Sequence, residues 1–254
     1  MYRLSVFFIG MIIISTGFSQ NKTEMKTING GTFVPLYGSD ENGIKVKSFK
    51  LDVYPVTNAQ FLEFVKKYPK WKKSKVLGLF ADKNYLTNWV SDESFGKELN
   101  PKSAVTNISW YAAKAYCECQ NKRLATMDEW EYAAMASQTK KNAQADSLFN
   151  QMIVESYETP KTYKKEVGST YKNYWGIYDM HGLVWEWTSD FNSVLISGES
   201  RQDVDTERNL FCGSGSVNAS DLMDYAAFMR YAFRGSIKAN YSIQNLGFRC
   251  AKDI

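Results

Sequence analysis

Helical patterns in this chain are short and widely spaced, and this constrains the fold more than any other feature. The first begins at Thr57 and stops before Pro69, and the second begins at Ser109. The third begins at the capping box Thr126–Glu129. Long aromatic stretches without clear periodicity separate them, and short alternating segments such as Ile44–Phe49 suggest strands. Because a parallel α/β protein would alternate strands and helices regularly, the pattern predicts one loop-rich α+β domain.

We expect this domain to span residues 20–254 and residues 1–19 to be a signal peptide. Arg3 gives a positively charged start, Leu4–Ile14 is a nearly unbroken apolar run, and small residues follow before a cleavage point near Ser19–Gln20. The run is too short for a comfortable membrane span, and no cysteine follows it directly to accept a lipid anchor. We therefore expect a periplasmic or secreted protein with no membrane span after cleavage. The alternative is a retained N-terminal anchor.

Charge and histidine content exclude several kinds of site. Lys and Arg number 31 against 27 Asp and Glu, a formal net charge of +4 that we treat as small and dispersed. The chain has neither zinc-finger spacing nor an RNA-binding aromatic motif, so we expect no nucleic-acid partner. With one histidine in the chain, metal sites that need two histidine ligands are excluded.

Four segments of the chain carry specific motifs. They are Leu51–Phe61, Val105–Cys117 continued by Lys122–Ala134, Tyr178–Trp187 (YDMHGLVWEW) and Asn245–Cys250 (NLGFRC). Together they resemble the sulfatase-modifying-factor family, whose best-known member is the formylglycine-generating enzyme. The resemblance runs from about residue 28 to the C-terminus in the family's order. It implies a compact, loop-rich α+β fold related to C-type-lectin-like domains.

The family enzyme oxidises a substrate cysteine with O2 and a copper ion held by two cysteines. The resemblance places these between a glycine-rich turn, here Cys212–Asn218, and the closing Cys250. No cysteine lies between Cys212 and Cys250. Since copper(I) needs soft thiolate ligands, we expect neither bound copper nor formylglycine formation. A lone Cys212 thiolate acting with Cys119 is the remaining alternative.

The four cysteines allow three pairings, and an oxidising compartment favours their formation. The resemblance implies a structural disulfide between Cys117 and Cys250. Cys119 and Cys212 would then be left for a second bridge.

The segment Leu183–Trp187 has several interpretations. In the family it supplies calcium ligands, an asparagine and a glutamate among them. Leu183 replaces the asparagine here, which leaves Glu186 as a weakened calcium candidate. Trp187 should share a strand face with Trp185 and lie either in the core or at a ligand site. For the nearby His181 we expect a packing or hydrogen-bonding role, the alternative being a general base.

Polar residues near the C-terminus match the border of the family's substrate groove. Those that the resemblance assigns to ligand binding are Ser216, Asn218, Arg230, Arg234 and Asn245, with Trp187 as a further candidate. The two arginines are four residues apart and fit either a fork for an acidic group or a buried salt bridge.

Two function classes remain. The first is a non-catalytic binding, maturation or accessory factor for another exported protein, with a protein or peptide partner. The alternative is a periplasmic oxidoreductase with cysteine-independent chemistry, as in family members that act in siderophore chromophore maturation.

Overall fold

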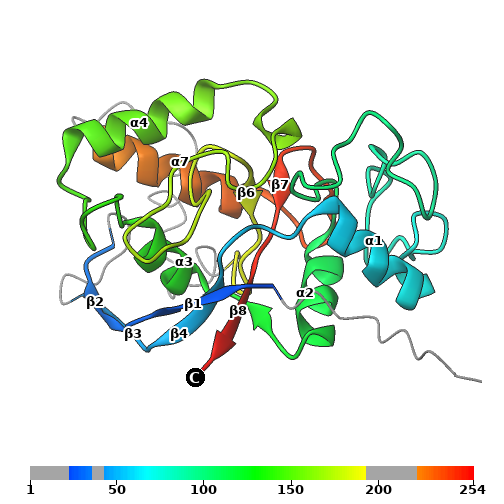
Figure 1. Ribbon diagram of the computed structural model, residues 1–254, viewed down its shortest axis with the longest axis horizontal. Helices are drawn as coiled ribbons and strands as arrows, with labels where there is room; N and C mark the ends of the chain where they lie inside the picture. The colour runs from blue at the N-terminus through cyan, green and yellow to red at the C-terminus, as the bar shows by residue number, and fades with distance from the viewer. Residues whose placement is uncertain (1–22, 36–42, 193–221) are drawn as a thin grey trace, which may run out of the picture.

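The computed structural model describes residues 23–35, 43–192 and 222–254. Its α-helices are α1 (Asn58–Lys67), α2 (Trp110–Cys119), α3 (Met127–Ala134), α4 (Ser147–Glu158) and α7 (Leu222–Ser236). Short 3-10 helices lie at Pro69–Trp71 and Thr162–Lys164. The strands are β1 (Met25–Ile28), β2 (Gly31–Phe33), β3 (Ile44–Val46), β4 (Phe49–Asp52), β5 (Arg123–Leu124), β6 (Trp185–Glu186), β7 (Leu246–Gly247) and β8 (Cys250–Asp253). The expected loop-rich α+β domain is confirmed (Figure 1).

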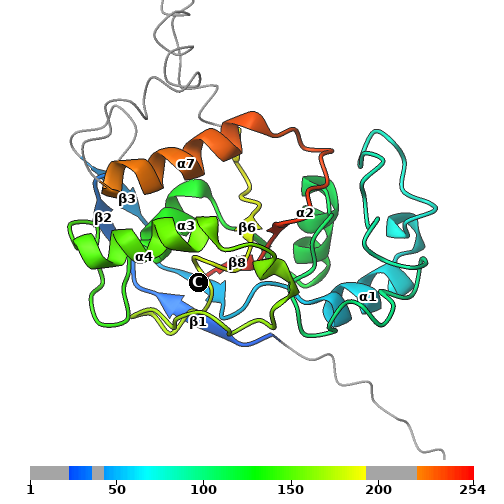
Figure 2. The same cartoon turned by 90° about the horizontal axis from the view of Figure 1, so that it is seen from above.

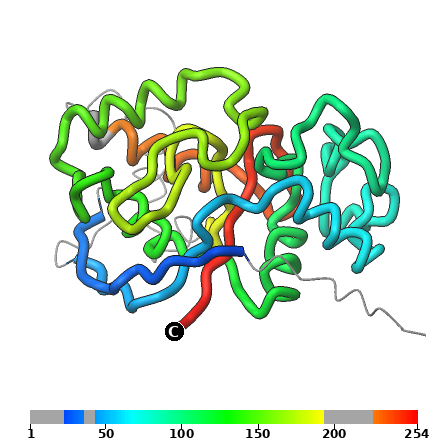
Figure 3. Tube along the Cα trace, in the orientation of Figure 1, coloured from blue at the N-terminus to red at the C-terminus, as the bar shows by residue number. Residues whose placement is uncertain are grey.

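An antiparallel sheet brings the two ends of the described chain together. Its strand order is β1-β4-β8-β5, so the C-terminal strand lies between an early strand and the one that follows α2. Figure 3 shows the red C-terminal strand β8 beside the lighter blue β4, with the dark-blue β1 on the other side of β4. Two small pairs complete the strands, antiparallel β2–β3 and parallel β6–β7. The segment Ile44–Phe49, predicted as one strand, is divided between β3 and the start of β4.

Side-chain caps begin the three helices that the sequence predicts. Thr57 and Thr126 form complete capping boxes, and the Ser109 side chain accepts from the Ala112 amide. Helix α4 was not predicted, although Asp146 caps it and its apolar residues Phe149 and Ile153 follow at helical spacing. These two side chains pack with Ala226 of α7, and Figure 2 shows α4 and α7 running close together.

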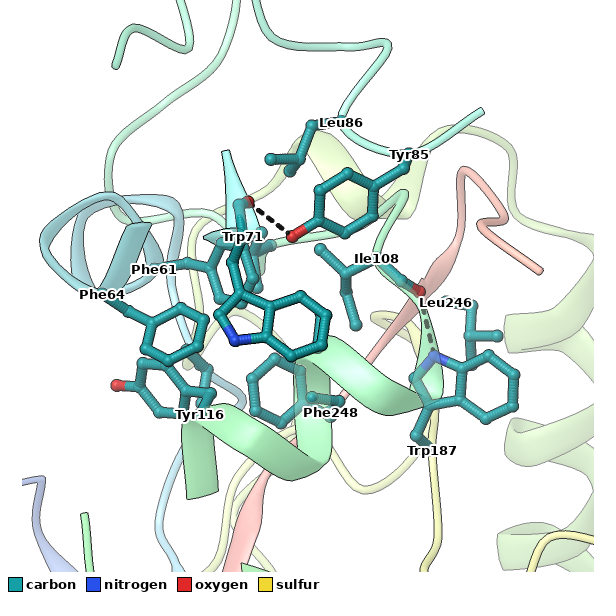
Figure 4. Close-up of a cluster of buried hydrophobic side chains, with 14 of the residues drawn as sticks. Phe61, Phe64, Trp71, Tyr85, Leu86, Ile108, Tyr116, Trp187, Leu246 and Phe248 are labelled. Carbon is teal, nitrogen blue, oxygen red and sulfur yellow. Dashed lines mark hydrogen bonds between the residues drawn. The ribbon is translucent and has the colours of Figure 1, made fainter. Parts of the chain in front are cut away.

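The larger hydrophobic core is built mainly from aromatic side chains of helices and loops. The Phe61 ring meets the Phe248 ring edge to face at 6.2 Å and stacks on Tyr116 at 6.0 Å (Figure 4). The Tyr85 hydroxyl donates to the Trp71 carbonyl at 3.0 Å. Buried aromatic groups thus find polar partners in the loop backbone, which lets a domain with few regular elements keep a dense core.

The Cys117–Cys250 disulfide that the resemblance implies is present. It joins α2 to β8 across 133 positions of sequence, with Cα atoms 5.5 Å apart. Cys119 is half-buried and donates its thiol to the Tyr116 carbonyl at 3.1 Å. Because Cys212 lies outside the described residues, the Cys119–Cys212 bridge stays a prediction.

The predicted signal peptide also lies outside the described residues. Within the described ranges, every helix falls short of the length and hydrophobicity that crossing a membrane requires.

Candidate functional site

A pocket of about 410 Å³ lies between the C-terminal end of α4, the segment before β6, helix α7 and the turn before β7. Figure 1 shows these four elements in the same part of the molecule. The residues that decide its chemistry are Tyr157, Trp185, Arg230, Arg234 and Asn245. The structure therefore brings three of the predicted ligand-binding residues, Arg230, Arg234 and Asn245, to one cavity.

A stack of three aromatic rings forms one wall. Trp185 lies against Tyr157 with ring centroids 4.9 Å apart and against Phe233 at 4.6 Å, each pair tilted by 26°. These two stacking contacts hold the partly buried Trp185 in place at the pocket. The wall is a rigid apolar surface contributed by α4, β6 and α7.

Two buried arginines share one carboxylate behind this wall. Glu131 of α3 accepts from Arg230 Nε at 3.0 Å and Nη2 at 2.8 Å, and from Arg234 Nη1 at 2.6 Å. Burial by itself would raise the pKa of Glu131, but the two guanidinium groups outweigh it and lower the pKa to about 2. The carboxylate is therefore charged at neutral pH and fixes both arginines.

Arg230 and Arg234 differ in how many of their guanidinium nitrogens have a hydrogen-bond partner among the described residues. The remaining nitrogen of Arg230, Nη1, donates to the Tyr157 hydroxyl and to the Ala226 carbonyl. Arg234 lies over the Trp130 ring, 4.8 Å from its centroid, and only its Nη1 donates to a described residue. Of the two alternatives from sequence, the buried salt bridge describes Arg230. Arg234 joins that salt bridge and also keeps two donor nitrogens, Nε and Nη2, without a partner among the described residues.

Asn245 is the third predicted residue at the pocket. Its backbone carbonyl accepts from the Trp185 amide at 2.8 Å, which joins the turn to the start of β6. Its side chain is half-buried in the pocket lining and has no hydrogen-bond partner in the described part of the chain. The other two groove candidates, Ser216 and Asn218, lie outside the described residues.

Glu186 has a different role from the calcium ligand considered above. Its oxygens accept from Arg249 Nε and Nη2 at 2.8–3.0 Å and from the Trp130 indole at 2.8 Å. Both ionic side chains are 1% exposed. The guanidinium occupies the place that a cation would take. Over the described ranges, no group of three or more His, Cys, Asp or Glu residues is placed to hold a metal ion.

Trp187 belongs to the core rather than to a ligand site. It is 1% exposed, its indole donates to the Ile108 carbonyl at 3.0 Å, and its ring meets Phe191 edge to face (Figure 4 shows the hydrogen bond). Trp185 and Trp130 line the pocket instead, and neither was among the ligand-binding candidates from the sequence. No local sequence signal identifies Trp185, because the parallel β6–β7 pairing of the folded chain sets it opposite Leu246, next to Asn245.

His181 has the packing and hydrogen-bonding role expected for it. Its Nε2 lies 3.0 Å from the Ala134 carbonyl, and the rings of Trp130 and Phe149 meet it edge to face. Burial, helped by the positive charge of Arg230, lowers its pKa from 6.5 to about 3. The imidazole is therefore neutral at pH 7, with the hydrogen on Nε2.

This depressed pKa makes the fold sensitive to mild acid. Between pH 6.5 and 3 the unfolded chain binds a proton at His181 that the folded protein does not, so stability falls as pH falls. We expect His181 to lower the free energy of unfolding by about 1.4 kcal/mol between pH 7.5 and 5.5. The variant His181→Gln, whose amide can still donate to Ala134, should lose this part of the slope in urea titrations at both pH values. Equal slopes in the two proteins would contradict the assignment.

The family can be decided from the sequence over nearly the whole chain. Residues 11–254 match the sequence model of the sulfatase-modifying factor enzyme 1-like domain. The chain belongs to this family. Two structures share the fold of this sulfatase-modifying-factor protein with a TM-score of 0.50: PvdO from Pseudomonas aeruginosa, at 17% identity over 91% of this chain and 95% of that chain, and CarF, at 15% identity over 91% and 98%. At these identities the likeness concerns the fold alone.

Relatives of this sulfatase-modifying-factor protein include enzymes and inactive proteins. The inactive C-alpha-formylglycine-generating enzyme 2 of Bos taurus is 28% identical over 82% of this chain and 78% of its own length. The formylglycine-generating enzyme of Streptomyces coelicolor is 29% identical over 83% and 80%. The serine/threonine-protein kinase pkn1 of Chlamydia caviae is 30% identical over 91% of this chain, but the match spans only 38% of the kinase.

Family membership implies a copper ion held by two thiolates, and the residues present do not fit one. The sulfurs of Cys117 and Cys250 are consumed in the disulfide. Cys119 lies at the end of α2, and none of the described residues that line the pocket is a cysteine. Cys212 alone would offer one thiolate where the metal needs two. We derive no copper-dependent step for this protein.

Proposed function

We propose that this sulfatase-modifying-factor protein is an exported binding, maturation or accessory factor that does not form formylglycine. Three observations support the proposal. The sequence has no cysteine between Cys212 and Cys250, an inactive formylglycine-generating enzyme is among its relatives, and the pocket lining combines two arginines and an asparagine with aromatic side chains. Export is supported by Arg3 and the apolar run Leu4–Ile14, which together have the form of a signal peptide.

The pocket supports binding because it combines a fixed apolar wall with free hydrogen-bond donors. Its volume of about 410 Å³ lies in the usual range for small-molecule sites and can take one large side chain or the end of a peptide. Arg234 offers Nε and Nη2, and Asn245 offers an amide that can both donate and accept. Nε and Nη2 of Arg234 carry the proposal, since neither bonds to a described residue and an arginine held by Glu131 at one nitrogen can still receive a carboxylate at two others.

We infer that the partner presents a carboxylate, either an acidic side chain or a chain terminus, next to an apolar group. A carboxylate matches the two donors and their charge, and the apolar group matches the stack around Trp185. No nucleophile with a base is needed for this role. His181, the one histidine, is neutral and directs its Nε2 to a backbone carbonyl.

Two variants test the pocket with peptides selected from a random phage-displayed library. Arg234→Lys keeps a charge beside Glu131 but removes the two free donors. It should weaken binding of the selected peptides by roughly 10- to 150-fold, the equivalent of about 1.5–3 kcal/mol. Asn245→Ala should weaken binding by a few-fold with little loss of stability, because its side chain makes no hydrogen bond to the described residues.

The matched control is Gln151→Ala, an exposed residue of the same α4 helix that bonds only along the helix to Glu155. It should bind the peptides as the unchanged protein does. Selected peptides that lack carboxylates, or that bind Arg234→Lys unchanged, would contradict the assignment of the pocket.

A further inference from the structure

Lysines are concentrated in one short segment, although the net charge of the whole chain is small. Residues 66–75 read KKYPKWKKSK and hold six lysines and no acidic residue. The segment covers the end of α1 and the 3-10 helix Pro69–Trp71. Positive charge is therefore less dispersed than the overall balance of +4 suggests.

Exposed apolar side chains lie next to these lysines. Leu77 and Leu79 follow directly in the sequence and are 64% and 72% exposed, and Val90 on the next loop is 75% exposed. Exposed apolar side chains that gather in a patch, especially one bordered by polar residues, mark sites that contact another protein or a membrane. Here they lie beside a cationic segment rather than singly over the molecule.

Polar contacts hold the two loops together as one surface. The Lys72 ammonium pairs with Glu93 at 2.5 Å, and Lys73 Nζ donates to the Trp89 carbonyl at 2.7 Å, one residue before Val90. The Ser74 amide and hydroxyl donate to Asp92 at 2.8 and 2.6 Å. These bonds join the lysine segment to the loop that carries Val90, and they do not use the ammonium groups of Lys67, Lys70 or Lys75.

The same contacts leave a net positive charge on this surface. Lys66 pairs with Glu63 and Lys72 with Glu93, which accounts for two of the nearby carboxylates. Lys67, Lys70 and Lys75 form no ion pair with any described residue and are exposed. Lys67 and Lys70 instead lie over the rings of Tyr68 and Trp71. Figures 1 and 2 both show this region at the end of the molecule beyond α1, away from α4 and α7.

We propose that this surface, formed by Lys67, Lys70, Lys75, Leu77, Leu79 and Val90, binds an anionic lipid membrane peripherally. Each lysine near an anionic leaflet adds a favourable electrostatic contribution, and apolar side chains beside the charges can enter the boundary between headgroups and acyl chains. A nucleic acid shares the negative charge but fits less well. Trp71 and Tyr85 are buried, so they cannot stack on bases, and the exposed leucines would stay in contact with water.

Sedimentation with vesicles of equal parts phosphatidylglycerol and phosphatidylcholine tests the proposal. The purified protein should bind these vesicles, bind pure phosphatidylcholine vesicles at least tenfold less, and be released by high salt. The triple change Lys67→Gln, Lys70→Gln and Lys75→Gln should lower binding at least tenfold. So should the double change Leu77→Ser and Leu79→Ser, although it leaves the charge unchanged.

The control removes the same charge elsewhere, by changing the exposed Lys45 of β3, Lys50 of β4 and Lys252 of β8 to Gln. It should reduce binding far less; an equal reduction, or unchanged binding by the leucine variant, would overturn the proposal. Tighter binding to a short duplex DNA than to the vesicles would also overturn it.

Acetylation of the unchanged protein gives a readout that needs no variant. Vesicles should protect Lys67, Lys70 and Lys75 from the reagent and leave Lys45 reactive, and equal reactivity at all four would count against the surface.

Discussion

Replacing Arg249 with methionine should lower the free energy of unfolding by about 3–5 kcal/mol. Arg249 is fully buried and binds both oxygens of Glu186, and it also donates to the backbone carbonyls of Asp52, Val53 and Tyr178. The change leaves the buried Glu186 carboxylate without its guanidinium partner, with only the Trp130 indole as a donor. Urea unfolding at pH 7 measures the loss.

Two controls separate an orphaned charge from a general loss of packing. In the double variant Glu186→Leu with Arg249→Met, both charges are gone, so it should recover much of the stability lost by the single change. Lys114→Met breaks an ion pair with Glu118 whose side chains are 49% and 58% exposed. It should cost less than about 1 kcal/mol. A single Arg249→Met variant as stable as Lys114→Met would contradict the role of the pair.

Removing the disulfide should have the second large effect. The double change Cys117→Ser and Cys250→Ser should lower the free energy of unfolding by about 2–5 kcal/mol, because the cross-link closes a long loop in the unfolded chain. Both sulfurs are buried between α2 and β8 and separated by 133 positions of sequence. Dithiothreitol should destabilise the unchanged protein by a similar amount.

Cys119→Ser is the matched control, since Cys119 lies two residues from Cys117 and is half-buried. With Cys119 as a free thiol, the change should alter stability by less than about 1 kcal/mol. A loss as large as that of the double change would instead show the predicted Cys119–Cys212 bridge. Peptide mapping under non-reducing conditions should recover the fragments of Cys117 and Cys250 linked together. Free thiols at both positions would show the pairing to be wrong.

Local signals in the sequence predicted the parts of the fold that depend on local chemistry. The caps at Thr57, Ser109 and Thr126 locate three helices because a hydroxyl near free amides acts within one turn. Helix α4 was not predicted because its apolar stripe is short and surrounded by polar residues. The stripe is buried only by contact with α7, which lies far away in the sequence. Sheet order was also out of reach, since β8 pairs with strands about 200 and 126 residues earlier in the sequence.

The candidate site shows the same division. The resemblance named Arg230, Arg234 and Asn245, and the structure gathers them at one pocket. The resemblance does not predict the ion pair between Glu131 and Arg230, because Glu131 is 99 residues away in the sequence. It also could not tell that Trp187 would turn to the Ile108 carbonyl in the core. Contacts between distant segments decide both outcomes.

The central claim is that this family member binds its partner without forming formylglycine, and one measurement tests it most directly. The purified protein, loaded with copper(I) under air, is incubated with a sulfatase-type peptide that contains the target cysteine, with the Streptomyces coelicolor enzyme as positive control. Mass spectrometry should find the cysteine of the peptide unchanged after incubation with this protein and an aldehyde after incubation with the control, because no cysteine lies between Cys212 and Cys250 to supply the thiolates that hold copper in the family enzyme. Copper-dependent conversion of the cysteine to the aldehyde by this protein would contradict the claim.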